Sequence, residues 1–258
     1  MARRRRLLSD TLQEVVAAPS KKRRLILGVQ FTLMSECIAS RPTAGRGACA
    51  LVAIMSTLLV FGWTTARMHY VFGGNWTAAF CTGTIFRVPP DLDVGTYRFE
   101  GAGYDGQFYR YLAHDPFLRN GYSHYVDAPQ LRFRRLLVPL GAWLLGFGRH
   151  SWIDSAYVAV EMLFLALGVY WCARLLTRRC RSPLWGILFV VVPATLASFD
   201  RMLVDGALTA LFAGFLLSCE EEEHWTYVWV LAMLAALTRE TGLLLGAALV
   251  TDRLLHRD

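Results

Sequence analysis

An apolar run of about nineteen residues, Ala48–Ala66, carries no charge and ends at Arg67, and it constrains this chain more than any other feature. A helix of that length crosses the roughly 30 Å hydrocarbon core of a bilayer. A cleaved signal peptide is the alternative, because arginines precede the run, but the residues after it give no convincing A-x-A cleavage site. The sequence therefore predicts a retained membrane span. The composition agrees, since 55% of the 258 residues are hydrophobic.

Positive charge is concentrated ahead of this run. Residues 1–47 hold ten Lys and Arg against three acids, whereas the rest of the chain holds seventeen of each, so this arm carries the whole net charge of +7. Its two basic blocks, Arg3–Arg6 and Lys21–Arg24, could suggest nucleic acid, but the chain that follows enters a membrane. We therefore predict a cytoplasmic arm that binds anionic membrane lipid, with no nucleic-acid partner. An unstructured tail is the alternative interpretation.

Further apolar runs predict an all-α integral membrane protein whose transmembrane domain, residues 48–258, is a bundle of about six spans. Ile153–Ala173 is a span despite Glu161 near its middle, which we interpret as a hydrogen-bonded residue of the bundle. An excess of arginine marks the cytoplasmic side of a membrane. The arginines behind this span are Arg174, Arg178, Arg179 and Arg181. This cluster therefore places the end of the span on the same inner side as the basic arm.

Two more stretches continue the bundle. Leu184–Phe199, kinked at Pro193, would return outward, and Met202–Ser218 would run inward. A polar hairpin joins them on the outer side. Asp200 could cap a helix that begins at Met202, whereas Asp205 would sit inside the span.

The last apolar segment is interrupted. Trp225–Leu237 and Leu243–Val250 flank a polar break at residues 238–242. They form either two short helices that meet at the break or one long helix. Polar groups at membrane depth must be buried in protein or line a cavity, so both versions place Arg239 and Glu240 in the interior.

The first two spans are separated by residues 67–150, which lie outside if the basic arm lies inside. Loops longer than about 60 residues translocate largely regardless of charge, so the arginines in this loop do not oppose the orientation. Leu136–Gly148 is too short for a span and is predicted to be a helix along the outer interface. A second short helix, Gly106–Ala113, is expected after Asp105, whose carboxylate would cap it at the Phe108 amide if its role is structural.

Polar residues fall in four places that this topology brings to the outer face. They are the GYDGQFY stretch around Asp105, the arginines Arg132, Arg134 and Arg135, the hairpin from Asp200 to Asp205, and the Arg239–Glu240 break. The aromatic rings beside Asp105 are of the kind that settle at a bilayer interface. For the arginine cluster, the alternative is that the side chains extend to lipid headgroups. The six cysteines and His69, His114 and His124 show no metal-ligand spacing, so no metal site is predicted.

The order of these elements resembles that of polytopic bacterial glycosyltransferases of the GT-C fold. The elements are a first span, an outer loop with G-Y-D-G-Q-F-Y, an R-x-R-R-L-x-x-P segment, a span pair joined by D-R-x-x-x-D, and a later L-T-R-E. The similar group is the dolichyl-phosphate-mannose protein mannosyltransferases and the lipid A aminoarabinose transferases. The resemblance covers about residues 48–250, and G-Y-D-G-Q-F-Y is its specific part. Such enzymes usually have more spans and often a soluble C-terminal domain.

The resemblance implies transfer of a sugar from a polyprenyl-phosphate donor to an acceptor on the outer face of a bacterial plasma membrane. Asp105 would act as the general base, and arginines would stabilise the leaving phosphate. The residues implied in substrate binding are Tyr104, Gln107, Tyr109, Arg132, Arg134, Arg135, Asp200, Asp205, Arg239 and Glu240. No cofactor is certain, and a divalent cation beside the phosphate is left open.

Two other classes of function are alternatives. One is a non-catalytic subunit that binds the lipid carrier or assists assembly with a membrane-protein partner. The other is a transporter, which Glu161 and the interrupted last segment favour and the lack of inverted repeats opposes. The catalytic interpretation predicts that Asp105 and at least one of Arg132, Arg134, Arg135 and Arg239 open onto one cavity on the outer side. It also requires the helices at Gly106–Ala113 and Leu136–Gly148 to lie side by side.

Overall fold

The computed structural model describes residues 45–221 and 225–255, so residues 1–44 of the predicted basic arm lie outside the described part. The described residues form α-helices and 3₁₀ helices (η) joined by loops. In chain order they are α3 (Arg46–Phe72), η1 (Trp76–Phe80), α4 (Pro90–Asp93), α5 (Gly106–His114), η2 (Tyr122–Tyr125), α6 (Pro129–Arg132), α7 (Leu137–Leu145), α8 (His150–Arg178), η3 (Pro183–Ile187), α9 (Leu188–Val191), α10 (Pro193–Asp200), α11 (Asp205–Glu220), α12 (Trp225–Thr238), η4 (Glu240–Gly242) and α13 (Leu243–Leu255). The predicted all-α fold class is confirmed for this part of the chain.

Two described helices, α3 and α8, are long and apolar enough to cross a membrane. With 27 and 29 residues they extend to about 40 Å, which exceeds the hydrocarbon thickness. The helix α3 continues six residues past the predicted end at Ala66 and stops at Gly73, whose backbone has φ +60° and whose N–H reaches the Met68 carbonyl. Glycine adopts this left-handed geometry without a Cβ penalty, so it ends the helix.

A third candidate span is bent. The segment from η3 through α9 to α10 passes the same test of length and hydropathy only as a pair of pieces that meet at 65°. Pro193 begins α10 and has no N–H to donate, which explains why the helix breaks there. The predicted kink at Pro193 is therefore confirmed.

The helix α11 begins at Asp205, three residues later than predicted. Met202 has φ +51°, so the chain turns there and Met202 cannot be the first helical residue. This corrects two expectations. Asp200 is the last residue of α10 and does not cap a helix at Met202. Asp205 lies in the first turn of α11, where a carboxylate interacts favourably with the helix dipole, rather than inside a span.

The last apolar segment forms two helices, α12 and α13, and this resolves the alternative left open by the sequence. Arg239, with φ −162°, is extended and ends α12, and the two helices pack against each other. They approach so closely that a Cβ on Gly242 would lie 2.1 Å from the Ala235 carbonyl oxygen. The expectation that Arg239 and Glu240 are interior is wrong, because their side chains are 35% and 30% exposed at this turn.

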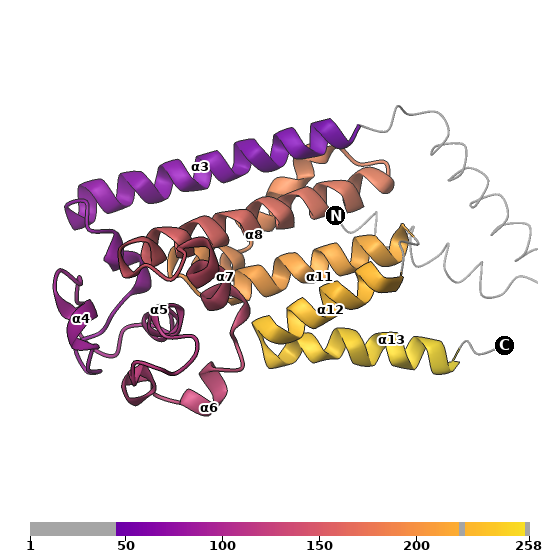
Figure 1. The fold of residues 1–258 in the computed structure, drawn as a ribbon. Coiled ribbons are helices and arrows are strands. Elements are labelled where there is room, and N and C mark those ends of the chain that lie inside the picture. The colour runs from indigo at the N-terminus through magenta and orange to yellow at the C-terminus, as the bar shows by residue number, and fades with distance from the viewer. Residues whose placement is uncertain (1–44, 222–224, 256–258) are drawn as a thin grey trace, which may run out of the picture. The chain divides into compact units, whose positions relative to one another are not determined.

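Figure 1 shows α3, α8, α11, α12 and α13 running side by side, with α4 to α7 gathered at one end. We call this the loop end; α3 ends there and α8 and α11 begin there. The helices α5 and α7 pack against each other and against α8, which confirms their predicted proximity. All nine residues of α5 are buried, so the rings of Phe108, Tyr109 and Tyr111 pack inside protein and not at a bilayer surface, contrary to our expectation.

Small residues allow α8 to pack closely against its neighbours. A Cβ on Gly168 would lie 2.3 Å from the Phe189 ring, and one on Gly214 would lie 2.8 Å from the Trp171 ring. Such contacts are typical of helix packing in membranes. The interior also holds the fully buried Glu161, and neither of its oxygens has a hydrogen-bond partner among the described residues. The prediction that Glu161 is hydrogen-bonded is therefore wrong.

The end of the bundle opposite the loop end carries the arginines at the C-terminal end of α8. Arg174 forms an ion pair with Glu221, and Arg178 lies 3.5 Å from the same carboxylate. Arg179 pairs with Glu220, and Arg178 donates to the Glu220 carbonyl over 2.8 Å. These contacts join the C-terminal ends of α8 and α11.

Candidate functional site

The loop that presents Asp105 is fixed by glycines and by Gln107. A Cβ on Gly83 would lie 2.3 Å from the Ala102 backbone, and one on Gly103 would lie 2.3 Å from the Cys81 carbonyl oxygen, so two backbone segments cross at contact distance. The fully buried Gln107 donates to the carbonyls of Ala102 (2.8 Å) and Tyr104 (3.0 Å) and accepts from the Gly83 N–H (3.2 Å). Its amide thus holds the loop rather than facing solvent.

Asp105 precedes α5 but does not cap it. Its backbone is helical, with φ −57° and ψ −25°, and its side chain makes no hydrogen bond to the first turn. The Phe108 amide donates to the backbone carbonyl of Asp105 instead, over 3.0 Å. The carboxylate points to Arg132, pairing Oδ1 with Nη2 at 2.8 Å and Oδ2 with Nη1. The carboxylate is 47% exposed, so it is held on one side and open on the other.

The Arg132 side chain is 8% exposed and acts as a clamp. Its Nε and Nη2 donate to the two oxygens of Asp127, each at a distance of 3.0 Å. Its Nη1 also donates to the Tyr109 hydroxyl at 3.3 Å. With the two bonds to Asp105, these contacts occupy all five N–H groups that a guanidinium carries. The bonds from Arg132 lower the pKa of Asp127, so this carboxylate stays ionised beside the clamp.

A second arginine extends the network to the last helices. Arg135 donates from Nη1 to the Tyr109 hydroxyl (2.9 Å) and from Nε to both oxygens of Glu240 (3.3 and 3.2 Å). Arg239, the residue before Glu240, forms an ion pair with Asp205 at the start of α11. The four polar places predicted from the sequence therefore do meet at the loop end. Arg134 is exposed, and no contact of its side chain joins it to this network.

Beside this network lies a cavity of about 490 Å³ with two further arginines on its wall. The Arg201 guanidinium stacks over the Tyr104 ring at 3.7 Å from the ring centroid. It donates no hydrogen bond to any described residue, so its N–H groups remain available. Arg67 pairs with Asp200 on the same wall, and its Nε has no partner among the described residues. The Cys81 thiol also lines the cavity, where burial raises its pKa.

This cavity does not meet the expectation that Asp105 and one of the predicted arginines open onto one cavity. Gly103 and Tyr104 line it, but Asp105 does not, and neither do Arg132, Arg134, Arg135 and Arg239. The cavity reaches the residue before Asp105 in the loop. Its two arginines were not singled out from the sequence, although Arg201 stands in the D-R-x-x-x-D turn and Arg67 closes the first apolar run. Asp127 was also missed, since no spacing connects it to Asp105.

Comparison with known proteins adds no relative. No family model, curated protein or solved structure matches this chain. The function is therefore argued from the site itself. In the described ranges no group of three or more His, Cys, Asp or Glu is arranged as a metal site.

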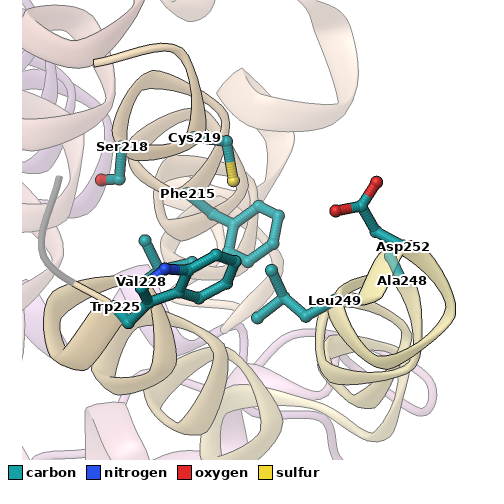
Figure 2. A pocket seen from close by; sticks show the side chains of 8 residues that line it. All are labelled: Phe215, Ser218, Cys219, Trp225, Val228, Ala248, Leu249 and Asp252. Atoms are coloured by element: carbon teal, nitrogen blue, oxygen red, sulfur yellow. The ribbon is translucent and has the colours of Figure 1, made fainter. Parts of the chain in front are cut away.

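Two other cavities are mainly apolar. One, of about 420 Å³, is a groove between α3 and α8 near the loop end, with Phe61, Trp76 and Phe80 on its wall and Asp154 at its edge. The other, of about 680 Å³, lies between α11, α12 and α13 at the opposite end of the bundle. Figure 2 shows the rings of Phe215 and Trp225 facing its centre, with Cys219 and Asp252 at its rim. This larger cavity is remote from the network around Asp105.

Proposed function

We propose that this chain is a membrane glycosyltransferase that moves a sugar from a polyprenyl-phosphate donor to an acceptor at the loop end. The observation that carries the proposal is the Asp105 carboxylate, which a buried arginine holds from one side while the other side stays exposed, next to a cavity lined by Arg67 and Arg201. A fixed, accessible carboxylate near a guanidinium with uncommitted donors, that of Arg201, is what proton abstraction coupled to phosphate departure needs.

In the proposed reaction, Asp105 takes the proton of an acceptor hydroxyl as the hydroxyl oxygen attacks the anomeric carbon of the sugar. The bond from that carbon to the phosphate oxygen breaks, and its electron pair leaves with the polyprenyl phosphate. Arg201 binds the phosphate through its uncommitted N–H groups, because a guanidinium stays charged and binds phosphate oxygens through paired donors. Arg67, whose Nη atoms donate to Asp200, contributes its positive charge. Arg132 acts as a positioning residue, since its own donors are committed within the protein.

The lipid part of the donor has a place in the same region. The apolar groove between α3 and α8 and the arginine-lined cavity are lined by consecutive residues at the end of η1, since Phe80 lines the groove and Cys81 the cavity. A prenyl chain in the groove would leave its phosphate near the cavity. The proposal includes a GT-C-like bundle of about six spans in a bacterial plasma membrane, with the loop end outside. Along the chain, α3 and α12 run towards the loop end, whereas α8, α11 and α13 run away from it, which suits this topology (Figure 1).

The test compares two variants that each remove one carboxylate partner of Arg132, Asp105→Asn and Asp127→Asn. Each protein is reconstituted in nanodiscs with a panel of undecaprenyl-phosphate hexoses and pentoses, and release of undecaprenyl phosphate is followed by mass spectrometry. A general base contributes about 10²–10⁴-fold, so Asp105→Asn should lose at least about 100-fold while Asp127→Asn retains most activity. Turnover by Asp105→Asn at the wild-type rate would refute the assignment of the base.

A second candidate is a non-catalytic subunit that binds the lipid carrier, and one observation favours it. Asp105 does not line the cavity that Arg67 and Arg201 line. This candidate predicts that undecaprenyl phosphate binds to the isolated chain without turnover and that Arg201→Gln weakens binding. It also predicts a stoichiometric multi-span partner in pull-downs from native membranes. Robust turnover by the isolated chain would exclude it.

A further inference from the structure

A second polar cluster joins α4, α5 and α8 at the loop end, and the proposed reaction does not use it. His114 is the last residue of α5 and His150 the first of α8. Their Nδ1 atoms lie 3.0 Å apart, and their ring centroids 4.9 Å apart. His114 is buried, whereas the His150 side chain is 48% exposed. Two imidazole nitrogens thus face each other at a site that solvent reaches from one side.

The other nitrogen of His114 is fixed by a carboxylate. Nε2 lies 3.0 Å from Oδ1 of Asp154, and Arg110 holds that carboxylate through Nε (2.9 and 3.1 Å) and Nη2 (2.8 Å). Because the paired carboxylate can only accept, the Nε2 of His114 must carry the proton. The Nδ1 atom therefore carries a lone pair, which can accept a hydrogen bond from the Nδ1–H of His150 at 3.0 Å; a metal ion would take the place of that proton.

Asp91 supplies a third donor near the pair. Its Oδ2 lies 4.0 Å from the Nδ1 of His150 and accepts a hydrogen bond from the Tyr122 hydroxyl. Asp91 belongs to α4, so the three side chains come from three separate helices. Its carboxylate is 54% exposed, and a shift towards the histidines would exchange the Tyr122 hydrogen bond for the metal.

We propose that His114 and His150 bind a divalent transition-metal ion through their Nδ1 atoms, with Asp91 as the third protein ligand and water completing the shell. Tetrahedral ligands at about 2.0–2.1 Å from a metal are about 3.3 Å apart, which is close to the observed nitrogen separation. The described residues contain no preformed three-ligand group, so metal binding requires the Asp91 carboxylate to move closer to the histidines than its 4.0 Å separation from the Nδ1 of His150.

The donor set decides the class of metal. Imidazole nitrogens with one carboxylate suit Zn²⁺, Co²⁺, Ni²⁺ or Cu²⁺, whereas Mg²⁺ and Ca²⁺ prefer oxygen ligands throughout. The Asp154 carboxylate behind His114 has the place of the outer hydrogen-bond acceptor that orients a metal-bound histidine. The metal would link α4 and the end of α5 to the start of α8 and so stabilise the position of α5.

The experiment uses the full chain in nanodiscs, with any affinity tag removed, and Co²⁺ as a coloured probe. Titration should show saturable binding of one Co²⁺ per chain, with the visible absorption of a low-coordinate site, and Zn²⁺ should displace it. The variants His150→Gln and Asp91→Asn alter half-exposed side chains, so they should fold, and the melting temperature Tm without metal checks this. Each should weaken Co²⁺ binding at least about tenfold.

His124→Gln is the matched control, because His124 is an exposed histidine of the same loop in η2. It should leave Co²⁺ binding unchanged. The proposal is overturned if no saturable binding occurs below millimolar Co²⁺, if His150→Gln or Asp91→Asn binds as well as wild type, or if His124→Gln loses binding equally. No sugar transfer is measured, so the result is independent of the proposed function.

Discussion

Replacing Arg132 should destabilise the loop end far more than replacing its partner Asp105. Arg132→Gln removes five hydrogen bonds, strands two carboxylates and opens a space where the guanidinium lies over the rings of Phe108 (5.2 Å) and Tyr109 (5.6 Å). Asp105→Asn leaves the Asp127 pair, the hydroxyl contact and an amide oxygen in place. The two variants therefore test whether Arg132 is the clamp of this network.

The structure sets the size of the effect. Breaking a fully buried ion pair costs about 3–5 kcal/mol, because a charge is left without a partner. Here Asp105 and Asp127 are 47% and 32% exposed, so water solvates them after the change and reduces the penalty. We expect a loss of about 2–3 kcal/mol for Arg132→Gln, including the lost stacking. Asp105→Asn weakens an ion pair that is half exposed on the Asp105 side, so we expect it to lower the free energy of unfolding by about 0.5–1 kcal/mol.

The assay is thermal unfolding in nanodiscs, followed by intrinsic tryptophan fluorescence. For a chain of this size, 1 kcal/mol shifts Tm by about 2–4 °C. Arg132→Gln should therefore lower Tm by about 4–12 °C, and Asp105→Asn by about 1–4 °C. The double variant should melt close to Arg132→Gln alone, because the interaction lost with Asp105 is already gone.

The reasoning is refuted by either of two outcomes. One is a Tm for Arg132→Gln within about 2 °C of wild type, which would mean that the buried guanidinium is not a support. The other is equal shifts for the two single variants, which would place the network's energy in the Asp105 contact alone. Arg134→Gln is the control, since Arg134 is exposed and lies outside the network, and its Tm should not change.

Two further predictions concern other parts of the fold. Gly242→Ala should lower the free energy of unfolding by about 1–3 kcal/mol, because the new Cβ would lie 2.1 Å from the Ala235 backbone. Gly246→Ala is the control and should be neutral or stabilising, since nothing lies within 4 Å of its Cβ. Equal melting temperatures of the two variants would contradict the close α12–α13 hairpin. Burial lowers the pKa of His114 below its usual 6.5. As the pH falls through 6.5, the unfolded chain therefore binds a proton that the folded chain does not. The free energy of unfolding should decline until the pH has passed the pKa of the folded state. Metal-free Tm measurements from about pH 7.5 to about pH 5 should show this decline in wild type and a smaller one in His114→Gln, and identical slopes would contradict it.

The features predicted best are those that local rules control. The positions of α3 and α8 follow from apolar runs long enough to cross a bilayer, and the bend at Pro193 follows from a missing N–H. The end of α3 was missed because Arg67 looked like a terminating charge. Its partner Asp200 lies 133 residues away and accepts its guanidinium, so the helix continues past it.

The sequence predicted which residues belong to the candidate site better than it predicted the contacts between them. The meeting of Asp105 with Arg132 was expected because both flank one loop that must fold back. The role of Asp127 was not, since only the folded chain shows that Arg132 lies between two carboxylates. Asp205 was assigned to a span because nothing in the sequence announces the left-handed turn at Met202. Tertiary geometry of this kind leaves no local pattern.

The arginines at the end of α8 meet Glu220 and Glu221 only in the finished bundle. During synthesis Arg178 is made 42 residues ahead of Glu220, an interval of about two to eight seconds at roughly 5–20 residues per second. In that interval no acidic residue neutralises the arginines. The membrane-insertion machinery, which retains basic segments on the cytoplasmic side, therefore encounters the full positive charge of the cluster. For a chain inserted in this way, the charge distribution that orients the protein is one that the folded protein no longer displays.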